Sequence, residues 1–182
     1  CGAWLALAGI HAKQIQLFNA IFRDGYRRIF IDKGRKAGAT ETALYILNRI
    51  AGLQPLRASY IIGPTQKEQS EICWQNRRIH QMCPSEWQPE FYSDHRVRFP
   101  NESFIKVAGA NDPDSSRGWE GDAFIWDEAK DHNPDALDAC YPNVLSRNAL
   151  WIVMGTPART KDNHFYKLKQ AVADDPEWFK IH

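Results

Sequence analysis

The chain has 182 residues, which is enough for one domain with a sizeable hydrophobic core. Its 23 lysines and arginines nearly balance 22 aspartates and glutamates, so the formal net charge of +1 excludes a global attraction to nucleic acid. No apolar run approaches the length of a membrane span, and the four cysteines have no zinc-binding spacing, which favours free thiols in a reducing compartment.

The first half of the chain predicts helices and strands in alternation. Residues 11–24 are expected to form a helix with Ile15, Phe18 and Phe22 on its apolar face. A strand at 27–31 then enters a loop at 32–40 that is rich in glycine and small residues, and a helix follows from Thr40 to about Ala51. Before this helical segment, the apolar opening lacks a basic region and an initiating methionine, which indicates no signal peptide and an excised piece of a longer protein.

The middle of the chain predicts a second strand and a hairpin. The strand covers 58–62, and Thr65 with Glu68 forms a capping box for a helix to about Met82. Residues 84–93 are expected to be irregular, and 96–99 with 103–107 are expected to pair as a hairpin.

The last third returns to buried strands. A polar loop at 111–121 leads to the strand 123–126, a helix begins at Asn133-Pro134, a strand covers 149–154, and a helix covers 162–174. Strands that alternate with helices predict an α/β fold whose mainly parallel sheet is covered on both faces.

The glycine-containing loop resembles a phosphate-binding loop, GxxxxGK[ST], but departs from it. Aligned on Gly38 and Thr40, the chain has Ala39 in place of the lysine and Lys33 in place of the first glycine. The hydroxyl and the following helix N-terminus remain, so an anion site is expected. Lys33 is the favoured substitute for the missing ammonium and Lys36 the second; alternatively these are solvated loop charges and the site is inactive.

Two carboxylates follow the apolar strand 123–126 directly. In a nucleotide-hydrolysing P-loop fold, Asp127 would hold Mg²⁺ and Glu128 would orient or deprotonate the attacking water. The alternative is a buried strand that runs into an acidic turn.

The order of these segments resembles the ATPase domain of the large terminase subunit, the motor that packages DNA into tailed-virus capsids. The resemblance runs from about residue 11 to 182 and implies a P-loop NTPase fold of the RecA/ASCE type. The matching segments are His11–Gln14, Gly34–Thr40, Gly63–Gln66, Ser116–Gly118, Asp127-Glu128 and Gly155–Pro157.

The resemblance implies roles for individual residues, with ATP and Mg²⁺ as cofactors. Thr40 and Asp127 would bind the metal, Glu128 would be catalytic and Thr156 would couple hydrolysis to motion. The nucleotide-binding residues would be Gln14 (with Gln16 as a competitor), Lys33, Gly34, Arg35, Lys36, Ala37, Gly38, Ala39 and Thr40. Arg117 would be an arginine finger in a neighbouring subunit's site, unless it pairs with Asp114 or Glu120; Arg35 is another candidate for the finger.

The resemblance also implies partners and a domain plan. Residues 1–182 would be one ATPase domain, with an adenine-side segment at 1–26, a core at 27–175 and the start of a linker at 176–182. The chain has no room for the nuclease domain, so no nuclease activity is expected. The partners would be double-stranded DNA, bound without sequence preference through basic stretches such as 77–78 or 96–98, further copies in a ring, a portal protein and a small terminase subunit. The location would be the host cytoplasm, without membrane contact.

Two other functions fit the same sequence. A helicase-like ATPase shares the strand ending in Asp127 and Glu128, but it would need a second RecA-like domain. A nucleotide-binding or DNA-scaffolding module without hydrolysis would explain the missing loop lysine.

Overall fold

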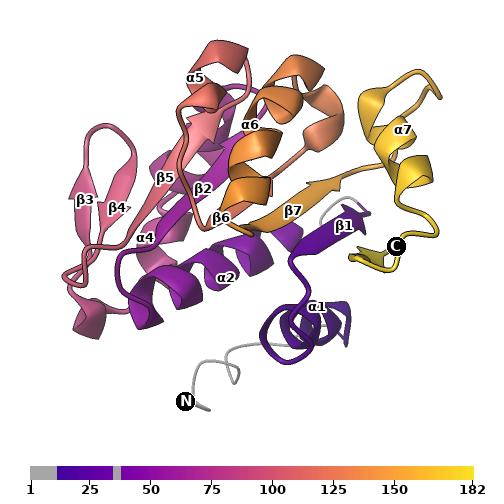
Figure 1. Cartoon of the computed structure of the whole chain (residues 1–182). Coiled ribbons are helices and arrows are strands. Elements are labelled where there is room, and N and C mark those ends of the chain that lie inside the picture. The colour runs from indigo at the N-terminus through magenta and orange to yellow at the C-terminus, as the bar shows by residue number, and fades with distance from the viewer. Residues whose placement is uncertain (1–11, 35–37) are drawn as a thin grey trace.

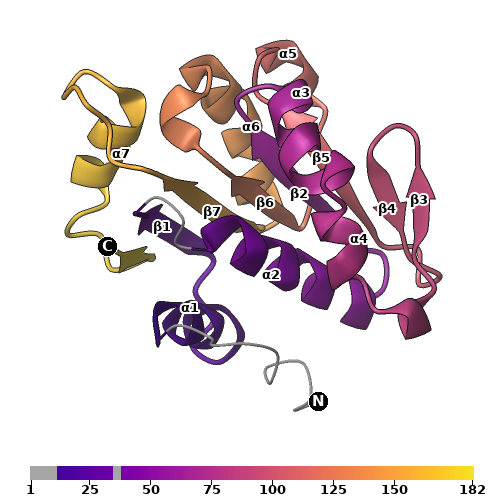
Figure 2. The same ribbon diagram turned by 180° about the vertical axis from the view of Figure 1, so that it is seen from behind.

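A computed structural model describes residues 12–34 and 38–182, and these residues form one mixed sheet with helices on both sides (Figures 1 and 2). The strand order is β3-β4-β5-β2-β6-β7-β1-β8. All neighbouring strands are parallel except in the antiparallel pairs β3–β4 and β4–β5. The strands are β1 Arg28–Asp32, β2 Ala58–Gly63, β3 Glu90–Tyr92, β4 Arg96–Arg98, β5 Phe104–Gly109, β6 Ala123–Trp126, β7 Leu150–Gly155 and β8 Trp178–Ile181. The expected mainly parallel α/β fold is confirmed.

The helices divide between the two faces of the sheet. They are α1 Ala12–Phe22, α2 Ala39–Leu53, α3 Gln66–Ser70, α4 Arg78–Met82, α5 Pro113–Arg117, α6 Pro134–Ser146 and α7 His164–Ala171, with short π or 3₁₀ turns at Glu71–Gln75, Ser85–Trp87 and Ala129–Asp131. Side chains alternate along each strand, so β6 sends Ile125 into a core with α1, α2 and α4, and Phe124 and Trp126 into a second core with α6 and α7. The central strands are therefore buried on both faces.

Several expected helix starts are present as hydrogen-bonded caps. Asn133 accepts from the backbone N–H of Asp135 at 3.0 Å, and Pro134 is the first helical residue. Thr65 accepts from the N–H of Glu68 at 3.1 Å.

The helix expected from Thr65 to Met82 is divided. Its first part, α3, passes into the π turn Glu71–Gln75, and Arg77 then adopts a left-handed conformation with φ of 55° before α4 begins. Sequence periodicity does not register this break, because apolar residues on both sides of it still face the sheet. The break directs α4 across α2.

Other boundaries and faces also differ from expectation. The buried residues of α1 are Leu17, Ala20 and Ile21, whereas the expected face residues Ile15 and Phe22 are exposed. Helix α2 continues through the expected stop at Gly52, which lies against the Trp87 ring. Three elements were not expected: β3, the short helix α5 in the polar loop, and β8, which pairs with β1 in a segment placed outside the core.

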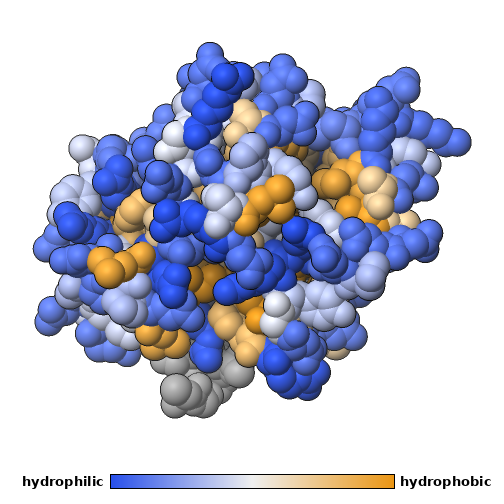
Figure 3. Space-filling view, viewed as in Figure 1, coloured by the Kyte–Doolittle hydropathy of each residue, from blue (hydrophilic) through white to orange (hydrophobic). Residues whose placement is uncertain are grey.

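The surface in Figure 3 is mainly hydrophilic, with separate apolar patches. Within the described ranges, none of the helices has the length and apolar character needed to cross a membrane. Cys73, Cys83 and Cys140 are buried free thiols, as expected.

Gly109, the last residue of β5, lies directly against the start of α3. A Cβ at this position would be 2.0 Å from the backbone nitrogen of Gln66. We expect Gly109→Ala to lower the free energy of unfolding by about 3 kcal/mol, since backbone atoms must move to relieve the overlap. Urea unfolding measures this, with Gly118→Ala as the control because its Cβ would meet nothing within 4 Å. Equal stability of the two variants would contradict the close packing of β5 on α3.

Candidate nucleotide-binding site

The carboxyl ends of β1, β7 and β6 meet at one edge of the sheet. Register pairs Asp32 with Gly155 and Trp126 with Val153, so Lys33, Thr156 and Asp127 follow neighbouring strand ends. Open α/β sheets bind ligands at this edge. The backbone N–H of Lys33 also donates to the carbonyl of Gly155 at 2.9 Å, which joins the loop after β1 to the end of β7.

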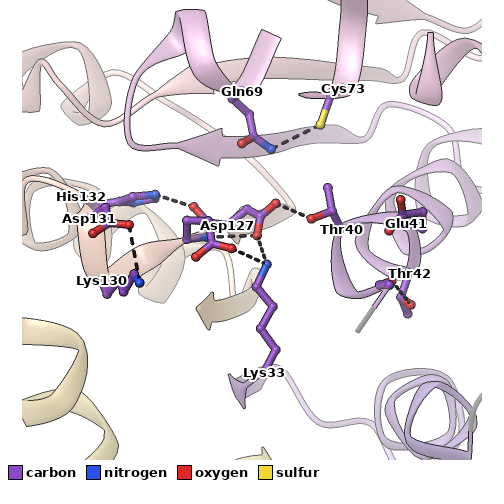
Figure 4. Close-up of polar contacts among 12 residues, drawn as sticks. Lys33, Thr40, Glu41, Thr42, Gln69, Cys73, Asp127, Lys130, Asp131 and His132 are labelled. Carbon is purple, nitrogen blue, oxygen red and sulfur yellow. Dashed lines mark hydrogen bonds and ion pairs between the residues drawn. The ribbon is translucent and has the colours of Figure 1, made fainter. Parts of the chain in front are cut away.

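Lys33 reaches across this edge to both carboxylates that follow β6 (Figure 4). Its Nζ lies 2.6 Å from Asp127 Oδ1 and 3.1 Å from Glu128 Oε1. The Lys33 side chain is 9% exposed and that of Asp127 is 1% exposed. Burial opposes the charged ammonium, but the two carboxylates outweigh it and raise the pKa of Lys33 above its ordinary value. Lys33 is therefore a cation held at the acid pair.

Thr40 approaches the same carboxylate from the start of α2. Its hydroxyl donates to Asp127 Oδ2 at 2.6 Å. Gly38, the residue before α2, has φ of 67°, a left-handed conformation that glycine adopts without steric cost. The first N–H groups of α2 have no partner within the helix, and the helix dipole favours an anion there. The loop's hydroxyl and the acid pair therefore belong to one site.

Glu128 is held in a strained backbone conformation that points it toward the same place. Its φ is 52°, which is uncommon for a residue with a Cβ and is frequent at functional sites. The Glu128 N–H donates to Asp127 Oδ1 at 3.0 Å. Its side chain is 34% exposed, in contrast to the buried Asp127. Glu128 can therefore meet a solvent molecule, whereas Asp127 faces protein groups.

Two imidazoles and one amide fix the turn that carries Glu128. His132 Nε2 lies 2.6 Å from the carbonyl of Asp127, His164 Nε2 lies 2.6 Å from the carbonyl of Ala129, and Asn163 donates to the carbonyl of Lys130 at 2.9 Å. Burial lowers the pKa of His132 to about 4, so this imidazole is neutral near pH 7, and its Nε2–H donates because a carbonyl oxygen can only accept. The turn is thus tied to the segment that follows β7.

A cavity of about 590 Å³ opens beside these groups. Its lining combines loop backbone, both signs of charge and the residue after β7. The lining residues are Lys33, Gly34, Gly38, Ala39, Thr40, Glu41, Arg78, Glu128, Lys130 and Thr156. This volume is within the range of small-molecule and cofactor pockets.

Most of the residues expected at the site lie in this cavity or touch its acid pair, but two do not. Gln14 donates to Thr42 Oγ1 at 2.8 Å and lies beside Gly38, outside the lining. Arg117 lies on α5 with its side chain 71% exposed, 3.5 Å from Asp114, which is one of the pairings that the sequence left open. His11, Arg35, Lys36 and Ala37 fall outside the described residues.

Sequence reasoning missed three charged residues of the lining. Glu41 and Lys130 directly follow or closely follow expected site residues, so adjacency in sequence could have suggested them. Arg78 was considered only as a DNA contact. No local signal places it in the cavity, because its position depends on the break in the helix before it.

The residues fit a magnesium ion that binds together with phosphate. The Lys33 ammonium is a stand-in cation at the place where Thr40 Oγ1 and the two acid side chains converge. Among the residues that the structure describes, no cluster of three or more His, Cys, Asp or Glu side chains could hold a metal ion by itself. Mg²⁺ takes six oxygen ligands and is commonly held by one or two protein groups with phosphate and water. A nucleotide would supply those ligands.

Comparison with solved structures identifies the fold. The ATPase domain of the large terminase of Thermus phage P74-26 superposes with a TM-score of 0.74 at 21% identity, covering 96% of this chain and 80% of that one. The large terminase of bacteriophage HK97 gives 0.81 at 15% identity, covering 96% and 39%. That of another thermophilic bacteriophage, solved with ADP and with ATP-γ-S, gives 0.77 in both complexes at 14% and 12% identity. No protein-family model and no curated protein matches the sequence. The chain has the fold of large terminase ATPase domains and spans less than half of the two longer terminases.

Proposed function

We propose that this chain, whose fold is that of large terminase ATPase domains, hydrolyses ATP to drive double-stranded DNA into a viral capsid. The observation that carries the proposal is the meeting of Lys33 and Thr40 with Asp127 and Glu128 beside one open cavity. The neighbours solved with ADP and ATP-γ-S support a nucleotide as the ligand.

The loop and Lys33 bind the phosphates. Backbone N–H groups at Gly38–Thr40 hold phosphate oxygens at the N-terminus of α2, where the helix dipole favours negative charge. Lys33 exchanges its carboxylate partners for the β- and γ-phosphate oxygens, and so takes the part of the lysine that Ala39 replaces. Its flexible four-carbon stem allows this movement.

Thr40 and Asp127 hold Mg²⁺ in this proposal, Asp127 directly or through water. When bound, the ion bridges phosphate oxygens and neutralises the charge that develops on them. The Thr40 hydroxyl, which donates to Asp127 in the structure, turns its oxygen lone pairs to the metal. The carboxylate released by Lys33 becomes the second protein ligand.

Glu128 acts on the attacking water. Its exposed carboxylate lies in the cavity wall while its backbone is fixed by the neighbouring imidazoles, so it can accept a proton from water without moving far. Thr156, at the end of β7, is placed to sense the terminal phosphate. The exposed Arg117 is proposed to complete the site of a neighbouring subunit in a ring.

The remaining parts of the proposal concern assembly. DNA is bound through its phosphates without sequence preference, and this binding weakens as salt rises. A portal protein and a small terminase subunit are the implied partners, the host cytoplasm is the implied location, and Gln14 is the implied adenine contact. The chain is proposed to be an ATPase domain that does not cleave DNA.

Ligand-induced stabilisation tests the proposal. With Mg²⁺ and ATP-γ-S at about 100 times the dissociation constant, the free energy of unfolding should rise by about 2.7 kcal/mol. Thr40→Val keeps the side-chain shape but removes the hydroxyl, so it should abolish most of the magnesium-dependent part of this gain. Wild-type protein that neither ATP-γ-S nor ADP stabilises would contradict the proposal, and binding without turnover in the assembled motor would favour the non-hydrolysing module.

A further inference from the structure

We propose that Arg78 binds the terminal phosphate of the nucleotide, and that Glu41 holds the Arg78 guanidinium at the cavity wall beforehand. The inference rests on the proposed function of the cavity, and it assigns a further binding residue to that site. It follows from the position of Arg78 in the fold, from its single partner and from the charges of the lining.

The broken helix puts Arg78 into the cavity. A continuous helix over residues 65–82 would carry Arg78 along the sheet in line with α3. The left-handed residue Arg77 instead ends the π turn, and α4 begins at Arg78 and packs on α2. Ile79, the next residue, is fully buried in the core beneath, which anchors the start of α4. The first residue of α4 is thus fixed beside the first turn of α2.

Glu41 is the partner that holds the Arg78 side chain. Arg78 Nη1 donates to Glu41 Oε1 at 2.6 Å, and the Arg78 side chain is 40% exposed. A guanidinium has five N–H donors in a planar fork. In the described part of the chain, Glu41 is the hydrogen-bond partner of this guanidinium, so donors remain for a ligand in the cavity that both residues line.

The place of Glu41 in α2 indicates which phosphate Arg78 reaches. The loop, Gly38 and Ala39 face the phosphates that enter first, and Thr40 faces the metal. Glu41 is one residue farther along α2, so its guanidinium partner lies beyond the metal-binding hydroxyl as seen from the loop. Glu128, which acts on the water that attacks the terminal phosphate, lines the same cavity. The geometry points to the terminal phosphate.

The charges of the lining make an exchange of partners favourable. The carboxylate of Glu41 in the first turn of α2 would repel a triphosphate if it were not neutralised. Arg78 neutralises it and can offer its remaining donors to phosphate oxygens, in the bidentate geometry that guanidinium groups favour. Lys33 and Lys130, the other lining cations, also have carboxylates nearby, at Asp127 and at Asp131. Of the three, Arg78 is the one whose printed contact uses a single donor of a five-donor group.

Calorimetric titration of the whole chain with Mg²⁺–ATP-γ-S and Mg²⁺–ADP tests the inference. Arg78→Ala should weaken ATP-γ-S binding about 10- to 100-fold, the worth of a charged hydrogen bond, and should change ADP binding less than about threefold. Glu41→Gln removes the same ion pair but keeps the guanidinium, so it should bind ATP-γ-S at least as tightly as the wild type. Arg147→Ala, which removes an exposed arginine paired with Glu120, is the control with wild-type affinities.

The outcomes separate this inference from the proposed function. Wild type that binds neither nucleotide overturns both. Wild type that binds both, with Arg78→Ala unchanged or weakened equally for ATP-γ-S and ADP, overturns the inference and leaves the function standing. Loss of ATP-γ-S affinity in Lys130→Ala but not in Arg78→Ala also overturns it. If Arg78→Ala melts below the assay temperature, Arg78→Lys, which keeps the charge but not the fork, is measured instead and should lose affinity for ATP-γ-S alone.

Discussion

Glu128→Gln is expected to lower ATP turnover about 10²- to 10⁴-fold while nucleotide binding is retained. The amide keeps the size of the side chain and its place in the cavity, but it cannot accept a proton from the attacking water. Asp127 and Thr40 remain to hold the metal, so binding of Mg²⁺–ATP-γ-S should persist. Phosphate release, measured alongside calorimetric binding in the assembled motor, checks both halves of the expectation.

Glu120→Gln makes the same chemical change at an exposed carboxylate that pairs with Arg147 on the surface. It should turn over ATP at the wild-type rate. Turnover in Glu128→Gln within threefold of wild type would remove Glu128 from its proposed role. Loss of nucleotide binding in the same variant would instead indicate a structural part in the cavity wall.

Lys33→Ala is expected to have two effects of opposite sign on ligand binding. Without its ammonium, the buried Asp127 loses its cationic partner, and we expect the unliganded protein to lose about 3 to 5 kcal/mol of unfolding free energy. Nucleotide affinity should fall by about two orders of magnitude, because the phosphates lose their lysine. Divalent cations alone should stabilise this variant more than the wild type, since the stand-in ammonium no longer occupies the metal position.

Thermal unfolding with and without Mg²⁺, and calorimetry with ATP-γ-S, measure these effects. Lys161→Ala, a change at an exposed lysine, is the control. A variant whose stability and affinity match those of wild type would contradict the role of Lys33. Loss of nucleotide affinity in Lys36→Ala rather than in Lys33→Ala would transfer the lysine's part to the second candidate of the sequence analysis.

The local signals in the sequence predicted the parts of the fold that depend on neighbouring residues. The apolar run of β6 followed by Asp127, the Asn133-Pro134 start of α6 and the hairpin at β4–β5 are all present. Each is decided within a few residues by burial, capping or turn chemistry. Because parallel strands end at a common edge, the sequence could also foresee that Thr40 and Asp127 would meet.

The features that the sequence did not predict depend on packing between distant segments. Gly52 was taken as a helix stop, but the helix continues and Trp87 from a later turn explains the glycine. The face of α1 is decided by contact with α2 and β8, so it turns inward at Leu17 and Ile21 and not at Ile15. The strand β8 is too short and too near the end of the chain for periodicity to separate it from a loop.

The site shows the same division. Lys33 was chosen because it precedes the loop, which is a local argument, and the structure places it at the acid pair. Arg78 was expected on a continuous helix, and only the left-handed Arg77 brings it to the cavity. The imidazoles that fix the Glu128 turn come from His132 nearby and His164 across the sheet edge, and no spacing in the sequence links them.

A structure of the chain with ATP-γ-S and Mn²⁺ tests the central claim most directly, because anomalous scattering locates the metal without assumption. The account predicts one Mn²⁺ between Thr40 and Asp127, the triphosphate in the cavity along Gly38–Thr40, and the Lys33 ammonium on phosphate oxygens in place of Asp127. A nucleotide bound elsewhere on the chain, or a Lys33 ammonium that stays on Asp127 with no metal beside it, would contradict the account.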